Sequence, residues 1–281
     1  MLERTRVAFV GSGVMAEAMI KGMLSRTLVS PGQITAAGPR PGRGAELKER
    51  YAVQPTYDNQ EAVREAGLVV LSVKPQVLPH VLEELHGRLP KDTLVLSIVA
   101  GARVAAIEQG LSHPFVVRAM PNTPAQIGQG MTVWTSSSQT GPKQREQAQT
   151  VLQALGQEIY VEDEDYLDMA TALSGTGPAY VFLLMEAMVD AGVHLGFPRY
   201  MSESLVLQTV KGSAEYALQT PQHLARLRNQ VTSPGGTSAE ALYYLEKAGV
   251  RTALSRAIWA AYQRSIQLGR GKKRSELAAE E

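Results

Sequence analysis

The hydrophobic positions of this chain change their spacing near residue 164. Before it, short apolar runs such as LVVLSV (68–73) and TLVLSIV (93–99) alternate with stretches of helical period. Nearly continuous apolar runs of this length are typical of strands that are covered on both faces. We therefore expect strands over 6–11, 33–38, 68–74, 93–99, 114–120, 131–135 and 158–161, with helices such as 44–51 and 59–66 between them.

Strand–helix alternation of this kind predicts an α/β fold, with a Rossmann-type, doubly wound parallel sheet as a first domain over residues 1–164. From 165 to 281 the apolar residues recur at helical spacing, with glycine or proline at the joints, which predicts an all-helical second domain. The segment 178–196 is apolar almost all round, so it needs burial on several sides. We therefore expect two subunits to pair through the helical domain.

Composition narrows the classes of partner. The 28 basic and 27 acidic residues leave a net charge of +1, which gives no electrostatic reason to expect nucleic acid or an anionic membrane as a partner. No apolar run reaches about 18 residues, so no membrane span is expected. There is no cysteine, and the N-terminus lacks a signal-peptide pattern, so we expect a cytoplasmic protein. The five histidines show no paired metal spacing, so we expect no metal site.

The first predicted strand runs directly into a glycine-rich turn, Gly11-Ser12-Gly13-Val14-Met15-Ala16, which opens a helix. Gly11 permits the tight turn, Gly13 lets the backbone approach a pyrophosphate, and Ala16 keeps the helix close to the sheet. The helix N-terminus supplies N–H groups to the anion. We interpret this turn as a dinucleotide site; a purely structural tight turn is the alternative.

The end of the second strand bears on the choice of cofactor. An NAD-selective site usually carries a carboxylate there, whereas this chain has Ala36-Ala37-Gly38-Pro39-Arg40, with Arg43 close behind. A guanidinium can bind a 2′-phosphate through two hydrogen bonds. The sequence therefore favours NADPH, with NADH as an alternative if both arginines are only solvated.

Two further loops follow later strands and lie where a nicotinamide is expected. These loops are Val73-Lys74-Pro75 and Met120-Pro121-Asn122. Ligands of open α/β sheets bind beyond the carboxyl ends of the strands. We expect Lys74 to contact the cofactor, and Asn122 or nearby backbone groups to hold the carboxamide or the ribose.

Two segments rich in hydroxyl groups and glycine occur in the helical part, SGTGPAY (174–180) and VTSPGGTSAEAL (231–242). Each is predicted to be a loop that enters a helix, and a row of free N–H groups there can bind a carboxylate without a cationic side chain. In the alternative interpretation, the hydroxyl groups only cap their own helices.

In these motifs the chain resembles the pyrroline-5-carboxylate reductases. The resemblance covers nearly the whole length and includes GSGVMA (11–16), VKPQ (73–76), VRAMPNTPAQIGQGMT (117–132), SGTGPAY (174–180) and VTSPGGTSAEALYYLEKAG (231–249). It implies reduction of the C=N bond of 1-pyrroline-5-carboxylate by NAD(P)H to give L-proline, the last step of proline biosynthesis. It also implies interlocked homodimers, often arranged as decamers.

The resemblance further implies which residues form the site. Those expected at the cofactor are Gly11, Ser12, Gly13, Val14, Met15, Arg40, Asn59, Val73, Lys74, Pro75, Met120, Pro121 and Asn122. Those expected at the substrate are Ser174, Gly175, Thr176, Ser233, Gly235, Gly236, Thr237 and Ser238. We assign the catalytic contact to the ring nitrogen to Ser238, where the family usually has threonine, so that the hydroxyl is kept and the methyl group is lost.

This reaction does not require an acid–base side chain. A cyclic imine can be protonated in water before it binds, so the protein mainly supplies proximity and orientation for hydride transfer. The enzymatic alternative is a β-hydroxyacid dehydrogenase, which needs a catalytic lysine, but Lys211 and Lys247 lie in no matching motif. A non-catalytic NADP-binding sensor is a third hypothesis.

Overall fold

The computed structural model describes residue 2 and residues 5–269. Its described residues up to Thr176 and from Ala261 onward form one compact unit, here unit 1, and Gly177–Ala260 form unit 2. The boundary expected at residue 164 therefore differs from the division by contacts, which keeps residues 165–176 with the sheet. Whether those residues act with the helical domain in function stays a prediction.

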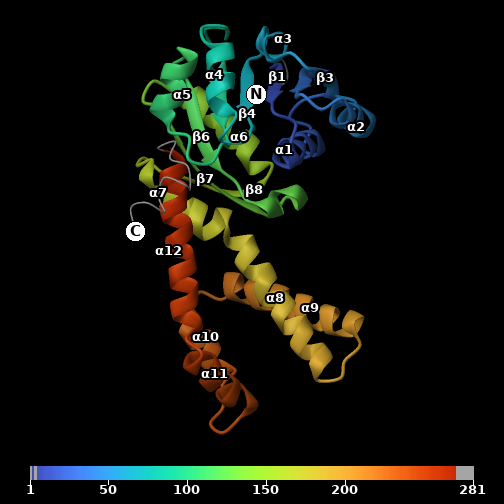
Figure 1. Ribbon diagram of the computed structural model, residues 1–281, viewed down its shortest axis with the longest axis vertical. Helices are drawn as coiled ribbons and strands as arrows, with labels where there is room; N and C mark the ends of the chain where they lie inside the picture. The colour runs from blue at the N-terminus through green and yellow to red at the C-terminus, as the bar shows by residue number, and fades with distance from the viewer. Residues whose placement is uncertain (1, 3–4, 270–281) are drawn as a thin grey trace. The chain divides into compact units, whose positions relative to one another are not determined.

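Unit 1 is built on one eight-stranded sheet with the order β3-β2-β1-β4-β5-β6-β7-β8 (Figure 1). The strands are β1 (Val7–Val10), β2 (Ile34–Ala37), β3 (Gln54–Thr56), β4 (Leu68–Leu71), β5 (Leu94–Ser97), β6 (Val116–Met120), β7 (Gly130–Ser136) and β8 (Gly156–Tyr160). The first six strands are parallel and have the order of a dinucleotide-binding fold. This confirms the predicted fold class.

Two details of the sheet differ from the prediction. Strand β7 pairs with β6 in the antiparallel sense, because the short connection between them contains only a 3-10 turn, and a parallel pair would need a longer crossover. Strand β3 was not predicted, since Gln54-Pro55-Thr56 is a short, polar edge strand without an apolar signal.

The helices connect and cover the strands. Those of unit 1 are α1 (Val14–Ser25), η1 (Pro31–Gln33), α2 (Pro41–Tyr51), α3 (Asn59–Val63), α4 (Leu78–Leu85), α5 (Val104–Leu111), η2 (Thr123–Ile127), α6 (Pro142–Gln153), α7 (Asp165–Ala170) and η3 (Thr171–Gly175). Alternate strand residues face two separate cores. Phe9 packs in the same core as Met19 of α1, whereas Val10 packs in the core that contains Leu85 of α4 and Ile107 of α5. The sheet is thus covered on both faces, as the continuous apolar strands predict.

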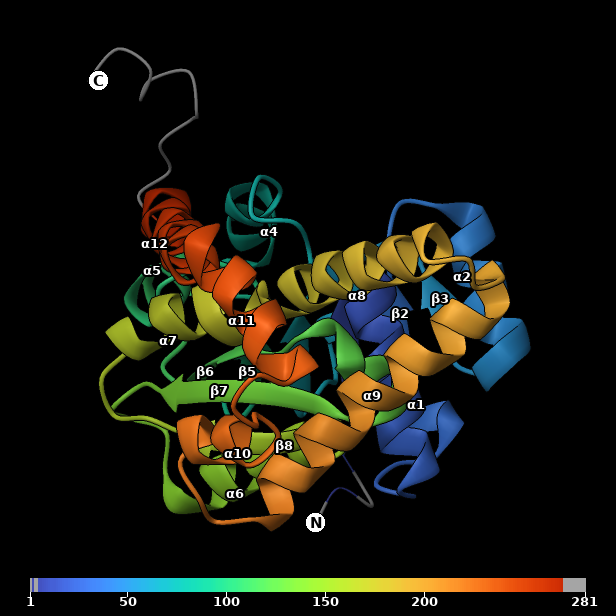
Figure 2. The same cartoon turned by 90° about the horizontal axis from the view of Figure 1, so that it is seen from below.

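Unit 2 consists of helices only, as predicted. These are α8 (Gly177–His194), α9 (Arg199–Gln219), α10 (Leu224–Gln230), α11 (Thr237–Lys247) and the first half of α12 (Val250–Gly269). Helices α8 and α9 lie side by side (Figures 1 and 2), and the Ser202 hydroxyl of α9 donates to the Val189 carbonyl of α8 at 2.8 Å. Large apolar side chains of α8 remain uncovered in the single chain; Leu183, for example, is 66% exposed.

Helix α8 continues the helical path of α7 and η3, so that residues Asp165–His194 form one 30-residue helix. By length and composition alone, it is the one helix of the described chain that could cross a membrane. The sequence still has no unbroken apolar run of that length, so the expectation of no membrane span stays a prediction. Isolated acidic residues interrupt the apolar run, but its average remains apolar enough to pass the test. Helices of this kind also occur in soluble proteins, where a partner covers them.

Candidate functional site

The glycine-rich turn joins the carboxyl end of β1 to α1. Gly11 has a φ of 99°, and a Cβ there would lie 2.8 Å from main-chain atoms of Ser72 and Val73, just beyond β4. A Cβ on Gly13 would meet nothing within 4 Å. The turn therefore lies between the carboxyl ends of β1 and β4, where the strand order reverses and dinucleotides bind in such sheets.

The N-terminus of α1 is not capped by a side chain. The N-cap residue is Gly13, and the first bond of the helix runs from Glu17 N to Gly13 O at 3.0 Å. An α-helix leaves its first N–H groups without partners in the helix, so those of α1 are free to bind an anion. Ser12 is 7% exposed and Val14 is exposed, so the turn has one buried and one open side.

The two arginines after β2 have different environments. The Arg43 side chain donates to the Ser12 carbonyl at 2.9 Å and pairs with Glu17 and with Glu46, the latter at 2.7 Å. Arg43 therefore supports the glycine-rich turn from within the protein. Arg40, the N-cap residue of α2, is exposed and has no ion pair within the part of the chain that the structure describes. Of the two, Arg40 is the one free to meet a 2′-phosphate.

Glu17 lies at the centre of this support. Burial disfavours its charged form, but hydrogen bonds from Arg43 and Tyr51 outweigh that effect and lower the pKa of Glu17. Burial also opposes the charge on Arg43, and the bonds to Glu17 and Glu46 still raise the pKa of Arg43. The pair therefore stays charged at neutral pH.

The other residues expected at the cofactor lie beyond neighbouring strands. Lys74 is exposed after β4 and forms no ion pair with a carboxylate among the described residues, while Val73 and Pro75 beside it are half-buried. At the start of α3, the Asn59 amide donates to Glu84 Oε2 at 2.8 Å. Lys74 can therefore reach a ligand directly, whereas part of the Asn59 side chain is already engaged.

The loop that follows β6 is fixed by its own side chain. Asn122 accepts a hydrogen bond from Met131 N at 2.9 Å, and its amide donates to the Ser174 carbonyl at 3.1 Å. Pro121 before it is buried. Both ends of the Asn122 amide therefore make a bond inside the protein, and these bonds fix the loop.

The expected loop at 174–180 is not a loop. Residues Thr171–Gly175 form a π-helical turn that continues into α8. The Ser174 hydroxyl donates to Ala170 O at 3.0 Å, and the Thr176 hydroxyl donates to Thr171 O at 2.8 Å. The wider turn absorbs the hydroxyl and glycine residues within the helix, so these hydroxyl groups satisfy local carbonyls.

The segment 231–242 does have the loop and helix entry that were predicted. Gly235 has a φ of 69°, Gly236 is the N-cap residue of α11, and no side chain caps this helix. Thr232 donates its hydroxyl to Arg228 O at 2.7 Å, which leaves three hydroxyl groups without a partner within the described residues, those of Ser233, Thr237 and Ser238. Capping therefore does not explain these three hydroxyl groups.

The candidate residues fall into two groups. Within unit 1, the structure brings the Met120–Asn122 loop against Ser174 and Gly175; a Cβ on Gly175 would lie 2.8 Å from the Met120 Cε atom. The residues 233–238 belong to unit 2.

A buried ion cluster behind β6 was missed by the sequence analysis. Arg118, 2% exposed, pairs with Glu164 at 2.8 Å and with Asp168 at 3.1 Å, and the Ser265 hydroxyl of α12 donates to Asp168 at 2.7 Å. The cluster therefore ties α7 and the end of α12 to the strand that leads into the Met120–Asn122 loop. The partners are far apart along the chain, so no local sequence motif predicts the cluster.

Three of the histidines bond to main-chain groups. His86 and His113 bond main-chain carbonyls with ring nitrogens, and the His223 side chain accepts from Ala225 N as the cap of α10. No group of three potential metal ligands among histidines and carboxylates occurs in the part of the chain that is described. Each of these three histidines therefore makes a structural bond to the main chain.

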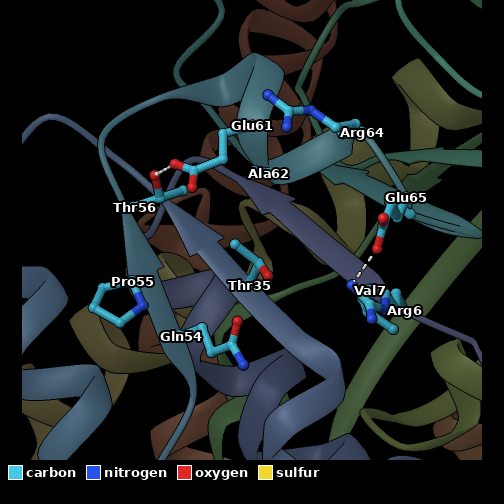
Figure 3. A pocket seen from close by; sticks show the side chains of 11 residues that line it. Arg6, Val7, Thr35, Gln54, Pro55, Thr56, Glu61, Ala62, Arg64 and Glu65 are labelled. Atoms are coloured by element: carbon cyan, nitrogen blue, oxygen red, sulfur yellow. Dashed lines mark hydrogen bonds and ion pairs between the residues drawn. The ribbon is translucent and has the colours of Figure 1, made fainter.

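A separate hollow of about 270 Å³ lies beside β2, β3 and α3 (Figure 3). Four of its polar side chains bond in pairs: Arg6 pairs with Glu65, and Thr56 donates to Glu61 at 2.6 Å. Because these groups satisfy each other, we assign no ligand to this hollow.

The two parts of the chain match two family models. Residues 164–268 match the model described as pyrroline-5-carboxylate reductase dimerisation, and residues 6–101 match that of the NADP oxidoreductases described as coenzyme F420-dependent. The first match covers most of the helical part, and the second covers the glycine-rich turn and the first five strands.

Whole proteins match over almost the full length. The pyrroline-5-carboxylate reductase of Synechocystis is 40% identical, over 94% of this chain and 98% of that protein, and that of Pseudomonas aeruginosa is 41% identical, over 94% and 96%. The crystal structure of the Plasmodium falciparum pyrroline carboxylate reductase with NADP bound has a TM-score of 0.88 at 30% identity, over 95% of this chain and 99% of that one. The chain therefore belongs to the pyrroline-5-carboxylate reductase family.

Proposed function

We propose that this protein reduces the C=N bond of 1-pyrroline-5-carboxylate by hydride transfer from NADPH and so forms L-proline, the last step of proline biosynthesis. The observation that supports this most directly is the entry to α11. On a chain of this family, it combines an uncapped helix N-terminus with unpaired hydroxyl groups at Ser233, Thr237 and Ser238. That combination suits a small ligand that carries a carboxylate and a ring nitrogen.

The cofactor binds along the carboxyl ends of the strands. The uncapped N-terminus of α1, with Gly11–Met15, receives the pyrophosphate. Arg40 receives the 2′-phosphate, which favours NADPH over NADH, and Asn59 lies on the adenosine side. Val73, Lys74, Pro75, Met120, Pro121 and the Asn122 backbone border the nicotinamide. Steady-state kinetics with NADH and NADPH side by side test the preference.

The substrate carboxylate binds to the N–H groups at the start of α11, between Gly235 and Ser238, and the Ser238 hydroxyl meets the ring nitrogen. Ser233 and Thr237 supply further hydroxyl groups. Ser174, Gly175 and Thr176 contribute their main chain and shape, because the two hydroxyl groups already donate to carbonyls of their own helix.

In the proposed reaction, solvent supplies the proton and the protein orients the reacting groups. Water protonates the imine before binding, and the iminium carbon then accepts the hydride from nicotinamide C4, which neutralises the nitrogen as the secondary amine. No proton has to be delivered in the same step, so the protein contributes proximity and orientation, an effect of up to several kcal/mol. This account agrees with a substrate segment, 231–242, that contains no histidine, cysteine or lysine.

The helical domain, residues 165–281, pairs with a second copy of the chain. Uncovered apolar side chains on α8, among them Phe182, Leu183 and Leu184, supply the surface for a homodimer, and dimers can assemble further into a decamer. The same pairing accounts for the apolar helix without a membrane. We place the enzyme in the cytoplasm and propose no nucleic-acid partner, in line with a net charge of +1.

The test is the oxidation of NADPH by purified protein with pyrroline-5-carboxylate, followed at the nicotinamide absorbance band. Wild-type turnover separates the reductase from a sensor that binds NADPH without consuming it. Oxidation of a β-hydroxy acid with NADP⁺, in the absence of pyrroline-5-carboxylate turnover, would instead identify a β-hydroxyacid dehydrogenase.

Two matched serine variants test the site. Ser238→Ala should lower kcat/KM for pyrroline-5-carboxylate by about tenfold or more with little change in stability, because its hydroxyl bonds to no described residue. Ser174→Ala should instead lower stability by about 1 kcal/mol, the usual contribution of one lost hydrogen bond, with near-normal kcat/KM. Unchanged kinetics in Ser238→Ala would remove that residue from the reaction.

A further inference from the structure

The Ser174 carbonyl lacks the partner that an ordinary helix would give it. In an α-helix this carbonyl would accept from the N–H four residues on, but that residue is Pro178, which has no N–H. The partly buried Asn122 side chain supplies the missing donor at 3.1 Å. The loop after β6 thereby gives the Ser174 carbonyl a donor that Pro178 cannot provide.

The same side chain holds the start of the next strand. Asn122 Oδ1 accepts from Met131 N at 2.9 Å, so the amide bridges β7 and the π-helical turn with its two ends. Packing reinforces the bridge, since Gly175 leaves room for the Met120 side chain and a Cβ there would approach its Cε atom to 2.8 Å. Two independent contacts therefore fix the Met120–Asn122 loop against the turn.

We propose that Asn122 is a positioning residue for hydride transfer. The inference rests on the proposed function, in which the main chain of this loop borders the nicotinamide. The amide of Asn122 holds the loop in a single conformation, and the loop in turn sets the position of the nicotinamide ring. The pyrophosphate is bound elsewhere, at α1, so the bridge governs the geometry of the reacting end and leaves the affinity for NADPH largely unchanged.

Asn122→Asp separates the two bonds of the bridge. A carboxylate still accepts from Met131 N but cannot donate to the Ser174 carbonyl, which it repels. Gln54→Glu is the matched control, because it makes the same chemical change on an amide that donates to the Gly32 carbonyl, on the β3 side of the sheet. We would measure kcat, the Kd of NADPH, and the isotope effect on kcat with NADPH deuterated at the transferred position.

We expect Asn122→Asp to lower kcat by about tenfold or more, since displacements of about 1 Å at reacting groups cost up to about a hundredfold. The Kd of NADPH should stay within about threefold of the wild type, and the isotope effect should rise as hydride transfer becomes limiting. Gln54→Glu should match the wild type in all three. A lower melting temperature with unchanged kcat and isotope effect would show a merely structural role and overturn the inference.

A second variant covers the case in which Asn122→Asp does not fold. Gly175→Ala displaces the Met120 side chain while leaving the amide bridge in place, and Gly32→Ala, where a Cβ meets nothing within 4 Å, controls for the substitution itself. Gly175→Ala should also lower kcat without raising the Kd of NADPH by more than about threefold. A normal kcat would show that displacing this loop does not affect hydride transfer, and it would overturn the inference. Absence of turnover in the wild type would refute the proposed function and this inference together, whereas normal turnover in the variants refutes the inference alone.

Discussion

Two alanine substitutions in the glycine-rich turn should separate folding from cofactor binding. Gly11 has a φ of 99°, and an added Cβ would lie 2.8 Å from three main-chain atoms of Ser72 and Val73. Gly13 has φ −78° and ψ −172°, which alanine adopts readily, and its added Cβ meets no protein atom within 4 Å. Gly11→Ala should therefore damage the fold, and Gly13→Ala should damage the cofactor site.

The magnitudes follow from these positions. At Gly11, a non-glycine residue in a sparsely populated conformation costs about 1–3 kcal/mol, and the neighbouring backbone cannot move without loss of the bond from Ser72 N to Val10 O at 2.9 Å. A total of about 3 kcal/mol lowers Tm by roughly 6–12 °C, at two to four degrees per kcal/mol. At Gly13, alanine gains about 0.4–1 kcal/mol through the unfolded state and loses a similar amount as an N-cap residue, so Tm should hardly change.

The affinity for NADPH should be lowered mainly by Gly13→Ala, the variant with little effect on Tm. A methyl group on Gly13 occupies the space through which a pyrophosphate approaches the backbone, and the loss of one or two charge-assisted hydrogen bonds raises the Kd of NADPH by at least about tenfold. Thermal melting without cofactor and titration with NADPH measure both quantities on the same samples. The reasoning is refuted if Gly11→Ala melts with the wild type, or if Gly13→Ala binds NADPH normally.

Two further outcomes follow from charged side chains. Arg40→Glu should raise the Kd of NADPH by about tenfold or more and change that of NADH by less than about threefold, because only NADPH carries the 2′-phosphate; equal effects on both cofactors would move the phosphate site away from Arg40. Burial disfavours the charged form of Glu158, but hydrogen bonds from Trp134, Gln149 and Gln153 outweigh it and lower its pKa. This carboxylate therefore stabilises the fold above its unfolded pKa, and that contribution is lost as the pH falls through the lowered value. Urea unfolding should show Glu158→Gln to be less stable than the wild type at neutral pH, with the difference shrinking as the pH falls below about 4.3, the usual pKa of a glutamate in an unfolded chain; a constant difference would contradict the assignment.

Much of the fold could be predicted because its signals are local. A continuous apolar strand such as 68–73, followed by a loop and an amphipathic helix, needs no knowledge of distant partners. The same is true of the glycine-rich turn, whose conformation depends on adjacent residues. Strand β3 and the antiparallel pairing of β7 could not be predicted in this way, since an edge strand needs little apolar surface and the direction of a strand depends on how its connection packs.

The two hydroxyl-rich segments show where composition stops being informative. SGTGPAY and VTSPGGTSAEAL look alike as patterns, yet in the first the hydroxyl groups of Ser174 and Thr176 bond within the helix, and in the second three hydroxyl groups have no partner in the described chain. The difference arises because a π-helical turn exposes carbonyls that a hydroxyl can reach locally, whereas the entry to α11 is an open turn. Only the three-dimensional structure distinguishes a hydroxyl that is already bonded from one that is available to a ligand.

Pro178 removes a helical hydrogen bond that a distant residue replaces. A proline four residues after Ser174 guarantees, from the sequence alone, that the Ser174 carbonyl has no ordinary helical donor. A half-buried acceptor of this kind needs another partner, and the structure supplies one. The donor is Asn122, 52 residues earlier, and no spacing rule connects the two positions. The same side chain that satisfies the helix also fixes the loop beside which the nicotinamide is proposed to lie. One residue, Asn122, therefore both donates to the Ser174 carbonyl and holds the loop proposed to position the nicotinamide. For this reason the Asn122→Asp variant tests the hydrogen bond that the fold uses together with its effect on the reaction.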